Sequence, residues 1–338
     1  MNICIYRPGA LGDLLVILPC LQRLYENPNV HITLIASPSW SVIARGMCNR
    51  FLSCEDTGLL PLFSGSLDLR NKPAWVPDTG FDKTFLFLVN EDIDLRSSFL
   101  QISSEVYRVQ SRPGTSENFQ KNLPNIRDFL FSGMFPEVTG GARPRACWPL
   151  TQLSQDPIEA GLKDPTAGLS TLPGIVFHAG SGSPEKNWPL ENYLQMADIC
   201  IDGGRPVFWT LGPADDGLKQ KLLSDSSHPL RIHNDARSVE VWNAKPEIGA
   251  NDEMHLLELT LDDLVVVLGR FNCLVGNDSG ITHLAAAMGL DVIAIFGASN
   301  PALWTPEGPH GYSRFLGKEQ EFPDLKSVEK VLSVVLNR

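Results

Sequence analysis

The chain has 338 residues, of which 43% are hydrophobic and 20% are charged. At roughly 150 residues per domain this length suggests two domains, and the composition excludes a disordered or collagen-like chain. The 28 Lys and Arg residues stand against 39 Asp and Glu, for a net charge of −11. That balance argues against a protein that grips nucleic acid through a basic surface.

Neither cysteine usage nor hydropathy indicates a secreted or membrane-spanning protein. The seven cysteines are scattered and form no C-x-x-C pair, so we expect neither a disulfide framework nor a zinc ribbon. No stretch approaches the roughly 18 consecutive apolar residues of a membrane span. The apolar run at 3–6 is too short for a signal peptide. We therefore expect a cytoplasmic protein.

The amino-terminal half predicts alternating strands and helices. Apolar residues recur at helical spacing between Leu14 and Leu24, directly after a short apolar run and a glycine turn. The strands expected in this half cover residues 3–6, 30–36, 83–89 and 105–109. The order strand, turn, helix, strand begins a βαβ unit on a parallel sheet.

A second alternating series follows a stretch at 152–173 that is rich in Pro, Gly, Ser, Thr and Asp. We interpret this stretch as the interdomain linker. The strands expected beyond it cover 175–178, 206–211, 273–276 and 292–296. Helices are expected after Pro189, at 281–288 and at 325–336.

Two such halves predict an α/β protein of two Rossmann-like domains, with parallel sheets facing each other across a cleft. We place the amino-terminal domain at 1–165 and the carboxyl-terminal domain at 166–320. We expect the last residues, 321–338, to form a helix that packs back on the amino-terminal domain.

A first candidate site lies in the turn Gly9-Ala10-Leu11-Gly12-Asp13, after the first strand. The glycines allow a tight turn, and Asp13 falls in the first turn of the helix at the carboxyl end of the strand. On spacing alone, the simpler interpretation is a helix-start carboxylate stabilised by the helix dipole. The pattern is also a poor dinucleotide fingerprint, because it reads G-x-x-G and not G-x-G-x-x-G.

A second candidate is the turn from Gly180 to Lys186, which also follows an expected strand. Its small residues expose backbone N–H groups and hydroxyls just before a helix, which suits phosphate oxygens. Lys186 adds a mobile positive charge. A Walker A loop is absent, and the alternative is a solvated surface loop that carries a lysine.

The third candidate is the segment 277–283, again after a buried strand. Asp278 or Ser279 can cap the helix, and Gly280 permits close approach of a ligand. Capping alone would explain Asp278, and His283 is explained at least as well by a buried core position as by a ligand contact. Two anion-accepting turns in one half together indicate a ligand with two linked phosphates.

The remaining carboxylates and histidines predict no metal site. Adjacent residues such as Asp262 and Asp263 do not converge on one metal, and we interpret this pair as helix-start carboxylates. For Asp215 and Asp216, a contact to a bound ribose is the less favoured alternative. The histidines form no H-x-x-x-H pair, so no zinc site is expected.

Three segments, in this order along the chain, together resemble glycosyltransferase family 9, whose best-known members are ADP-heptose:lipopolysaccharide heptosyltransferases. They are RPGALGD at 7–13, HAGSGSPEKNWP at 178–189 and GNDSGITH at 276–283. The stretch 296–304 is also similar to the family. Residues 58–141 carry no motif that we can match, and in this family acceptor recognition lies largely in that half.

The resemblance implies a GT-B architecture, with the nucleotide-sugar held by the carboxyl-terminal domain and the acceptor by the amino-terminal one. It implies inverting, metal-independent transfer of a heptose or related sugar from an ADP-sugar to a hydroxyl of a lipopolysaccharide-core or other glycan acceptor. No cofactor is implied beyond that donor. The expected partners are the donor and the glycan acceptor, with no nucleic acid and at most peripheral contact with the inner membrane at its cytoplasmic face.

The resemblance also implies roles for individual residues. Asp13 matches the general base, and Lys186 is expected to act on the leaving diphosphate. The residues expected to bind the donor are Gly12, Gly180, Ser181, Ser183, Asp278, Ser279, Gly280 and His283. Two alternatives remain open, a sugar-nucleotide epimerase of the same fold and a catalytically silent nucleotide-sugar-binding protein.

Overall fold

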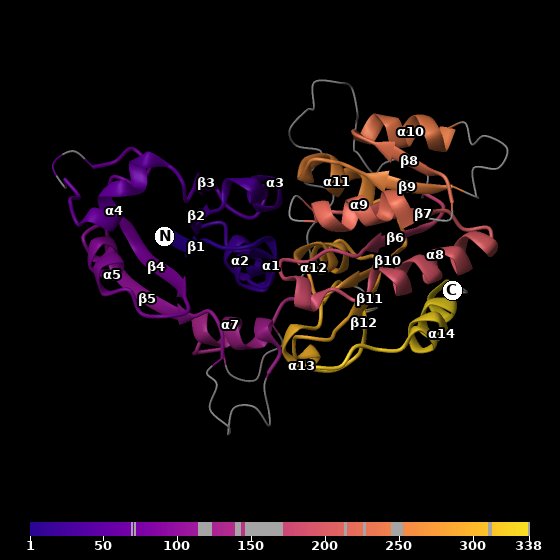
Figure 1. The fold of residues 1–338 in the computed structure, drawn as a ribbon. Helices are drawn as coiled ribbons and strands as arrows, with labels where there is room; N and C mark the ends of the chain where they lie inside the picture. Colours follow the sequence, from indigo (N-terminus) through magenta and orange to yellow (C-terminus); the bar gives the residue numbers. More distant parts are fainter. Residues whose placement is uncertain are drawn as a thin grey trace. The chain divides into compact units, whose positions relative to one another are not determined.

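The computed structural model divides the chain into two compact units, Met1–Ala146 and Cys147–Arg338 (Figure 1). The structure describes residues 1–68, 70, 72–113, 124–138, 143–145, 172–212, 215–225, 228–244, 253–309 and 313–336. Residues 152–171 of the predicted linker, and the predicted domain boundary at 165/166, lie outside the described residues.

Within the described residues of the first unit, parallel strands form a sheet in the order β3-β2-β1-β4-β5. Its strands are β1 (Asn2–Arg7), β2 (His31–Ala36), β3 (Arg50–Ser53), β4 (Phe81–Leu88) and β5 (Ser103–Gln110). Its helices are α1 (Leu11–Leu15), α2 (Leu18–Tyr25), α3 (Ser41–Ala44), α4 (Leu60–Ser64), α5 (Ile93–Leu100) and α7 (Ile126–Met134), with short 3-10 turns η1 (Pro38–Trp40) and η2 (Thr57–Leu59). The apolar run at 3–6 is buried in β1, as parallel sheets covered on both faces require.

The helix predicted between Leu14 and Leu24 is divided into α1 and α2. Pro19 causes the division, because it has no backbone N–H and its ring clashes with the carbonyl four residues earlier in a continuous helix. It occupies the first turn of α2 instead, where no such bond is needed. Strand β3 was not predicted, since its four residues are only partly buried and begin with Arg50.

The described residues of the second unit form a parallel sheet in the order β12-β11-β10-β6-β7-β9-β8. The strands are β6 (Ile175–His178), β7 (Val207–Thr210), β8 (Leu230–His233), β9 (Met254–Leu257), β10 (Cys273–Asn277), β11 (Asp291–Ile295) and β12 (Ser313–Leu316). The helices are α8 (Leu190–Asp202), α9 (Asp216–Asp225), α10 (Ala236–Ala244), α11 (Leu261–Leu268), α12 (Gly280–Ala287), α13 (Pro301–Trp304) and α14 (Leu325–Leu336), with the 3-10 turn η4 (Pro184–Lys186). The paired α/β architecture predicted from the sequence is confirmed, although β8, β9 and β12 were not predicted.

Helix α14 belongs to the second unit. Its Val328 and Leu332 are buried in the core that also contains Ile175 and Ile293, and it packs on α8 and β11. Packing of residues 321–338 on the amino-terminal domain stays a prediction. The helical spacing of the apolar residues identified the helix but could not identify its partner.

Each sheet has a point where the chain order reverses. In the first sheet this point lies between β1 and β4, and in the second it lies between β6 and β10. Ligands of open α/β sheets bind at such switch points, beyond the carboxyl ends of the strands. The candidate turns after β1, β6 and β10 all begin there. No helix in the described part of the chain has the length and apolar content needed to cross a membrane.

Two histidines on the neighbouring strands β8 and β9 are buried side by side in the second unit. His233 Nε2 of β8 and His255 Nδ1 of β9 are 3.1 Å apart, and both rings are buried. The His255 ring also stacks on Phe208, with ring centroids 4.5 Å apart. Burial, reinforced by His233 and Arg231, lowers the pKa of His255 to about 3.

We predict that the unfolding free energy falls as the pH decreases from 7 to 5. An unfolded histidine binds a proton near pH 6.5 that buried His255 excludes, so this residue alone lowers stability by about 2 kcal/mol over that interval. Denaturant titrations at both pH values measure the effect. His255→Gln should flatten the dependence and His31→Gln, at an exposed site, should not; an equal slope in the wild type and His255→Gln would contradict the prediction.

Candidate active site

The two phosphate-suited turns of the second unit emerge side by side because β6 and β10 are hydrogen-bonded neighbours. In this pairing His178 lies opposite Gly276, at the carboxyl ends of both strands. The segment after β6 carries Ser181 to Lys186, and the turn after β10 carries Asp278 to Gly280. Sheet topology therefore brings together two motifs that are far apart in the sequence.

An ion pair joins the two turns. Lys186 Nζ lies 2.7 Å from Asp278 Oδ2, and the Asp278 side chain is 5% exposed whereas that of Lys186 is 34% exposed. Ser299, in the loop after β11, donates its hydroxyl to the same Asp278 oxygen at 2.6 Å. The buried anion is thus held by two other segments of the chain, while its cation remains accessible.

The surroundings of Asp278 keep its carboxylate ionised. Burial raises the pKa of Asp278, but the contact with His283 and the charge of Lys186 outweigh burial and hold it well below its ordinary value. His283 Nε2 lies 3.5 Å from Asp278 Oδ1, and its side chain is 3% exposed. The structure thus places His283 in the buried position that the simpler interpretation expected, facing the carboxylate.

The helix cap is assigned to Ser279, so the Asp278 carboxylate is available for Lys186. Ser279 Oγ accepts a hydrogen bond from the Thr282 N–H at 3.3 Å, and Gly280 is the first residue of α12. The interpretation that Asp278 serves only as a cap is therefore excluded. The first N–H groups of α12 lie at the switch point, where helix ends favour anions.

The turn after β6 is shaped by its own serines. Ser181 donates its hydroxyl to the Ser183 carbonyl at 2.6 Å, and the Ser183 N–H donates back to Ser181 Oγ at 3.2 Å. The Ser183 hydroxyl donates to Glu185 Oε1 at 2.8 Å. Both serines are partly exposed. Their hydroxyls thus hold a compact turn at the surface next to Lys186.

Asp215 packs against the same turn, a contact that was not predicted from the sequence, where a contact of Asp215 or Asp216 with a bound ribose was only the less favoured alternative. The side chain is buried, and Oδ2 accepts a hydrogen bond from the Gly212 N–H at 2.7 Å. A Cβ at position 180 would overlap this carboxylate, so Gly180 is required by close approach. By contrast, nothing lies within 4 Å of a Cβ at Gly182.

In the first unit, Asp13 is the third residue of α1 and is held by two donors. Its Oδ1 accepts from Arg7 at 2.9 Å, and its Oδ2 accepts from the Ala10 N–H at 3.1 Å. Arg7 is 4% exposed and Asp13 27% exposed, and Arg7 also donates to Ser111 at 3.0 Å. Burial lowers the pKa of the Arg7 guanidinium, and the charge of Asp13 opposes that effect.

The remaining residue of this motif, Gly12, is the second residue of α1 and belongs to the first unit, whereas the other expected donor-binding residues belong to the second. Sequence reasoning did not identify Arg7 or Ser299 as contributors, although both lie in segments that resemble the family. Within the described residues, no group of three or more His, Cys, Asp or Glu could hold a metal ion.

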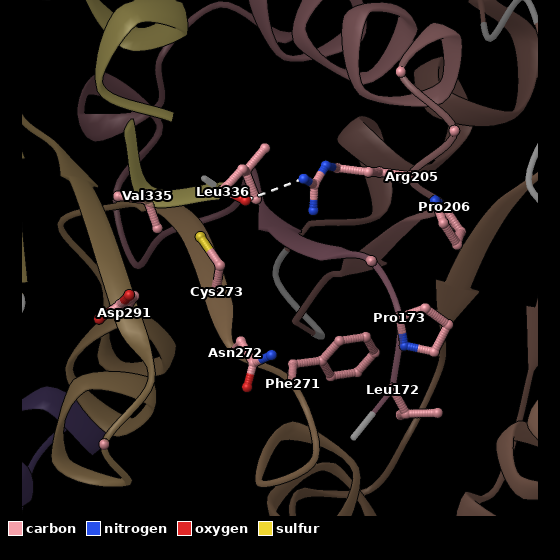
Figure 2. A pocket seen from close by; sticks show the side chains of 14 residues that line it. Leu172, Pro173, Arg205, Pro206, Phe271, Asn272, Cys273, Asp291, Val335 and Leu336 are labelled. Carbon is pink, nitrogen blue, oxygen red and sulfur yellow. Dashed lines mark hydrogen bonds between the residues drawn. The ribbon is translucent and has the colours of Figure 1, made fainter. Parts of the chain in front are cut away.

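A separate pocket of about 770 Å³ lies at the opposite edge of the second sheet (Figure 2). Arg205, Asn272, Cys273 and Asp291 contribute polar groups to its lining, at the amino ends of β7, β10 and β11. None of the predicted site residues lines it. Because ligands of open α/β sheets bind at the carboxyl ends, this pocket is not the candidate site.

Comparison with known proteins identifies the family of the chain. A family model described as glycosyltransferase family 9 (heptosyltransferase) matches residues 145–334. Lipopolysaccharide heptosyltransferase 2 of Escherichia coli (strain K12) is 26% identical over 164 residues, which cover 47% of this chain but only 40% of that protein. Lipooligosaccharide heptosyltransferase 2 of Haemophilus influenzae is 22% identical over 322 residues, covering 90% of this chain and 86% of that protein.

The fold comparison extends over both units. The solved structure of E. coli ADP-heptose LPS heptosyltransferase II superposes with a TM-score of 0.65 at 16% identity, covering 99% of this chain and 98% of that one. The two parallel-sheet units and this similarity define the GT-B fold. Because the family model matches more than half of its residues, the chain belongs to glycosyltransferase family 9.

We predict that Gly180→Ala destabilises the second unit by about 1–3 kcal/mol, because the new methyl group displaces the buried Asp215 carboxylate. Gly182→Ala is the matched control, since it adds the same methyl group two residues away in open space. Thermal and denaturant unfolding of the two variants measure the difference. Equal stability of both variants would contradict the close packing of Asp215 on this turn.

Proposed function

We propose that the chain is an inverting heptosyltransferase that moves a heptose from ADP-heptose to a hydroxyl of a lipopolysaccharide-core or other glycan acceptor. The observation that carries the proposal is the partly exposed Lys186 ammonium, held by buried Asp278 between two phosphate-suited turns. Membership of family 9 supports the class of reaction, and the names of the relatives support the sugar and the acceptor.

The donor diphosphate is proposed to bind where the two turns meet. Lys186 supplies a full positive charge, and the amides of the Ser181 turn and of the first turn of α12 supply fixed dipoles. Ser183 and Ser279 offer hydroxyls at the same edge of the sheet. These groups would stabilise the charge that develops on the departing ADP, the kind of contribution that preorganised electrostatics make to transfer reactions.

Asp13 is proposed as the general base. Inverting displacement requires a group that accepts the proton of the attacking hydroxyl as the new glycosidic bond forms and the bond to ADP breaks. The Asp13 carboxylate is held by Arg7 and by the Ala10 N–H, yet it keeps solvent access and unused lone pairs. Its orientation is therefore set before the acceptor arrives.

The proposal requires no bound metal, because Lys186 and backbone amides would stabilise the charge on the leaving group. The reaction would take place in the cytoplasm, with contact at the inner membrane confined to a peripheral encounter with the acceptor. An epimerase of the same fold would consume the nucleotide-sugar without an acceptor. A silent binding protein would hold ADP and turn over nothing.

We predict that Asp13→Asn lowers kcat about 10²- to 10⁴-fold, the contribution of a positioned general base, while ADP binding is retained. Asparagine keeps an oxygen that can accept from Arg7 or Ala10, so the turn should fold. Release of ADP from ADP-heptose with a lipopolysaccharide-core acceptor measures turnover, and calorimetry measures ADP binding. Asp94→Asn, at an exposed carboxylate in the first turn of α5, is the matched control.

Three results would contradict the proposal in different ways. Normal turnover by Asp13→Asn would exclude this residue as the base. Consumption of ADP-heptose in the absence of any acceptor would favour the epimerase. Binding of ADP without turnover on any glycan acceptor would favour the silent binding protein.

A further inference from the structure

Asn277, the last residue of β10, forms hydrogen bonds with both turns of the candidate site. Its side chain is fully buried. Its Oδ1 accepts from the Trp188 N–H at 3.0 Å and from the Tyr193 hydroxyl at 3.0 Å. Its Nδ2 donates to the Ala179 carbonyl at 2.7 Å. One amide therefore contacts both ends of the segment that carries Ser181, Ser183 and Lys186.

The backbone of Asn277 contributes to the other turn. Its carbonyl accepts from the Thr282 hydroxyl at 2.6 Å, and the same hydroxyl lies 3.0 Å from Ser279 Oγ, the cap of α12. Asp278 is the next residue in the chain. The position of Asp278, and that of the segment bearing its partner Lys186, thus depend on one residue that is itself out of reach of solvent.

Asparagine suits this position because its side-chain amide carries an acceptor oxygen and a donor NH₂ group on the same carbon atom. An aspartate would keep the oxygens for Trp188 and Tyr193 but would oppose the Ala179 carbonyl with a second acceptor. A leucine would leave buried polar groups without partners, which destabilises the folded state. The bonds to Asn277 are therefore specific to the amide.

The far end of the segment is also fastened in the core. Trp188 is 1% exposed, and its ring N–H donates to the Pro323 carbonyl at 3.1 Å. The ring meets Tyr193 edge-on, with centroids 5.1 Å apart. Lys186 lies two residues before this fixed point, so a shift of Trp188 away from Asn277 would carry the lysine away from Asp278.

We infer that Asn277 is a positioning residue for donor binding, which fastens residues 179–188 to β10 so that Lys186 stays opposite Asp278. It acts through these neighbours and does not touch the donor. The inference rests on the proposed function in that the group being positioned is the binding site for the donor diphosphate. The described contacts that carry it all lie within the second unit.

The test compares Asn277→Asp with Asn272→Asp, the same substitution at the exposed residue that directly precedes β10. Calorimetry with ADP should show binding about tenfold weaker for Asn277→Asp and unchanged for Asn272→Asp. Hydrogen exchange of the amides in 179–188 should be faster in Asn277→Asp alone. Tyr193→Phe, which removes one hydroxyl contact to Asn277, should act in the same direction to a smaller extent.

A double-mutant cycle with Lys186→Ala separates positioning from general destabilisation. If Asn277 acts through Lys186, the loss of the lysine should weaken ADP binding much less in the Asn277→Asp background than in the wild type. Equal losses in both backgrounds, or unchanged ADP binding and exchange in Asn277→Asp, would overturn the inference. If Asn277→Asp does not fold, the same cycle with Tyr193→Phe decides in the same way.

Failure of the proposed function would look different. Wild-type protein that does not bind ADP would contradict the proposed donor. Faster exchange of 179–188 in Asn277→Asp would still show that Asn277 fastens this segment. Unchanged exchange would refute the fastening whatever the ligand.

Discussion

The candidate site depends on the buried carboxylate of Asp278, which requires polar partners to remain charged. Asp278 is almost fully enclosed and ionised, and a charge in such a place is stable only when it is paired and hydrogen-bonded. Lys186, His283 and Ser299 satisfy it, and removing one partner of a buried pair typically costs about 3–5 kcal/mol. The adjacency of β6 and β10 at the switch point makes the pairing possible.

Each unit pairs a cation with a carboxylate near the carboxyl end of a strand at its switch point. The two units differ in which member of the pair is exposed. In the first unit Arg7 is buried and Asp13 is accessible; in the second, Asp278 is buried and Lys186 is accessible. One unit therefore presents an anion and the other a cation. This difference suits a base for an incoming hydroxyl on the first unit and a site for a diphosphate on the second.

Much of this arrangement could be predicted from the sequence, because continuous apolar runs mark buried parallel strands and glycine turns mark their carboxyl ends. Short strands such as β8 and β12 carry polar residues and gave no such signal. Periodicity identified α14 but not the surface that it covers. The contacts of Asn277, Ser299 and Asp215 were not predictable, since each depends on which strands are neighbours in the sheet, a property that local pattern does not encode.

The most direct test of the central claim is a crystal structure of the full chain with ADP. In that structure we expect the diphosphate to lie within hydrogen-bond distance of Lys186 Nζ and of the backbone amides in the turns after β6 and β10. The claim would be contradicted if the diphosphate occupied the pocket at the amino ends of the strands near Arg205, or if Lys186 kept its contact with Asp278 while ADP bound elsewhere.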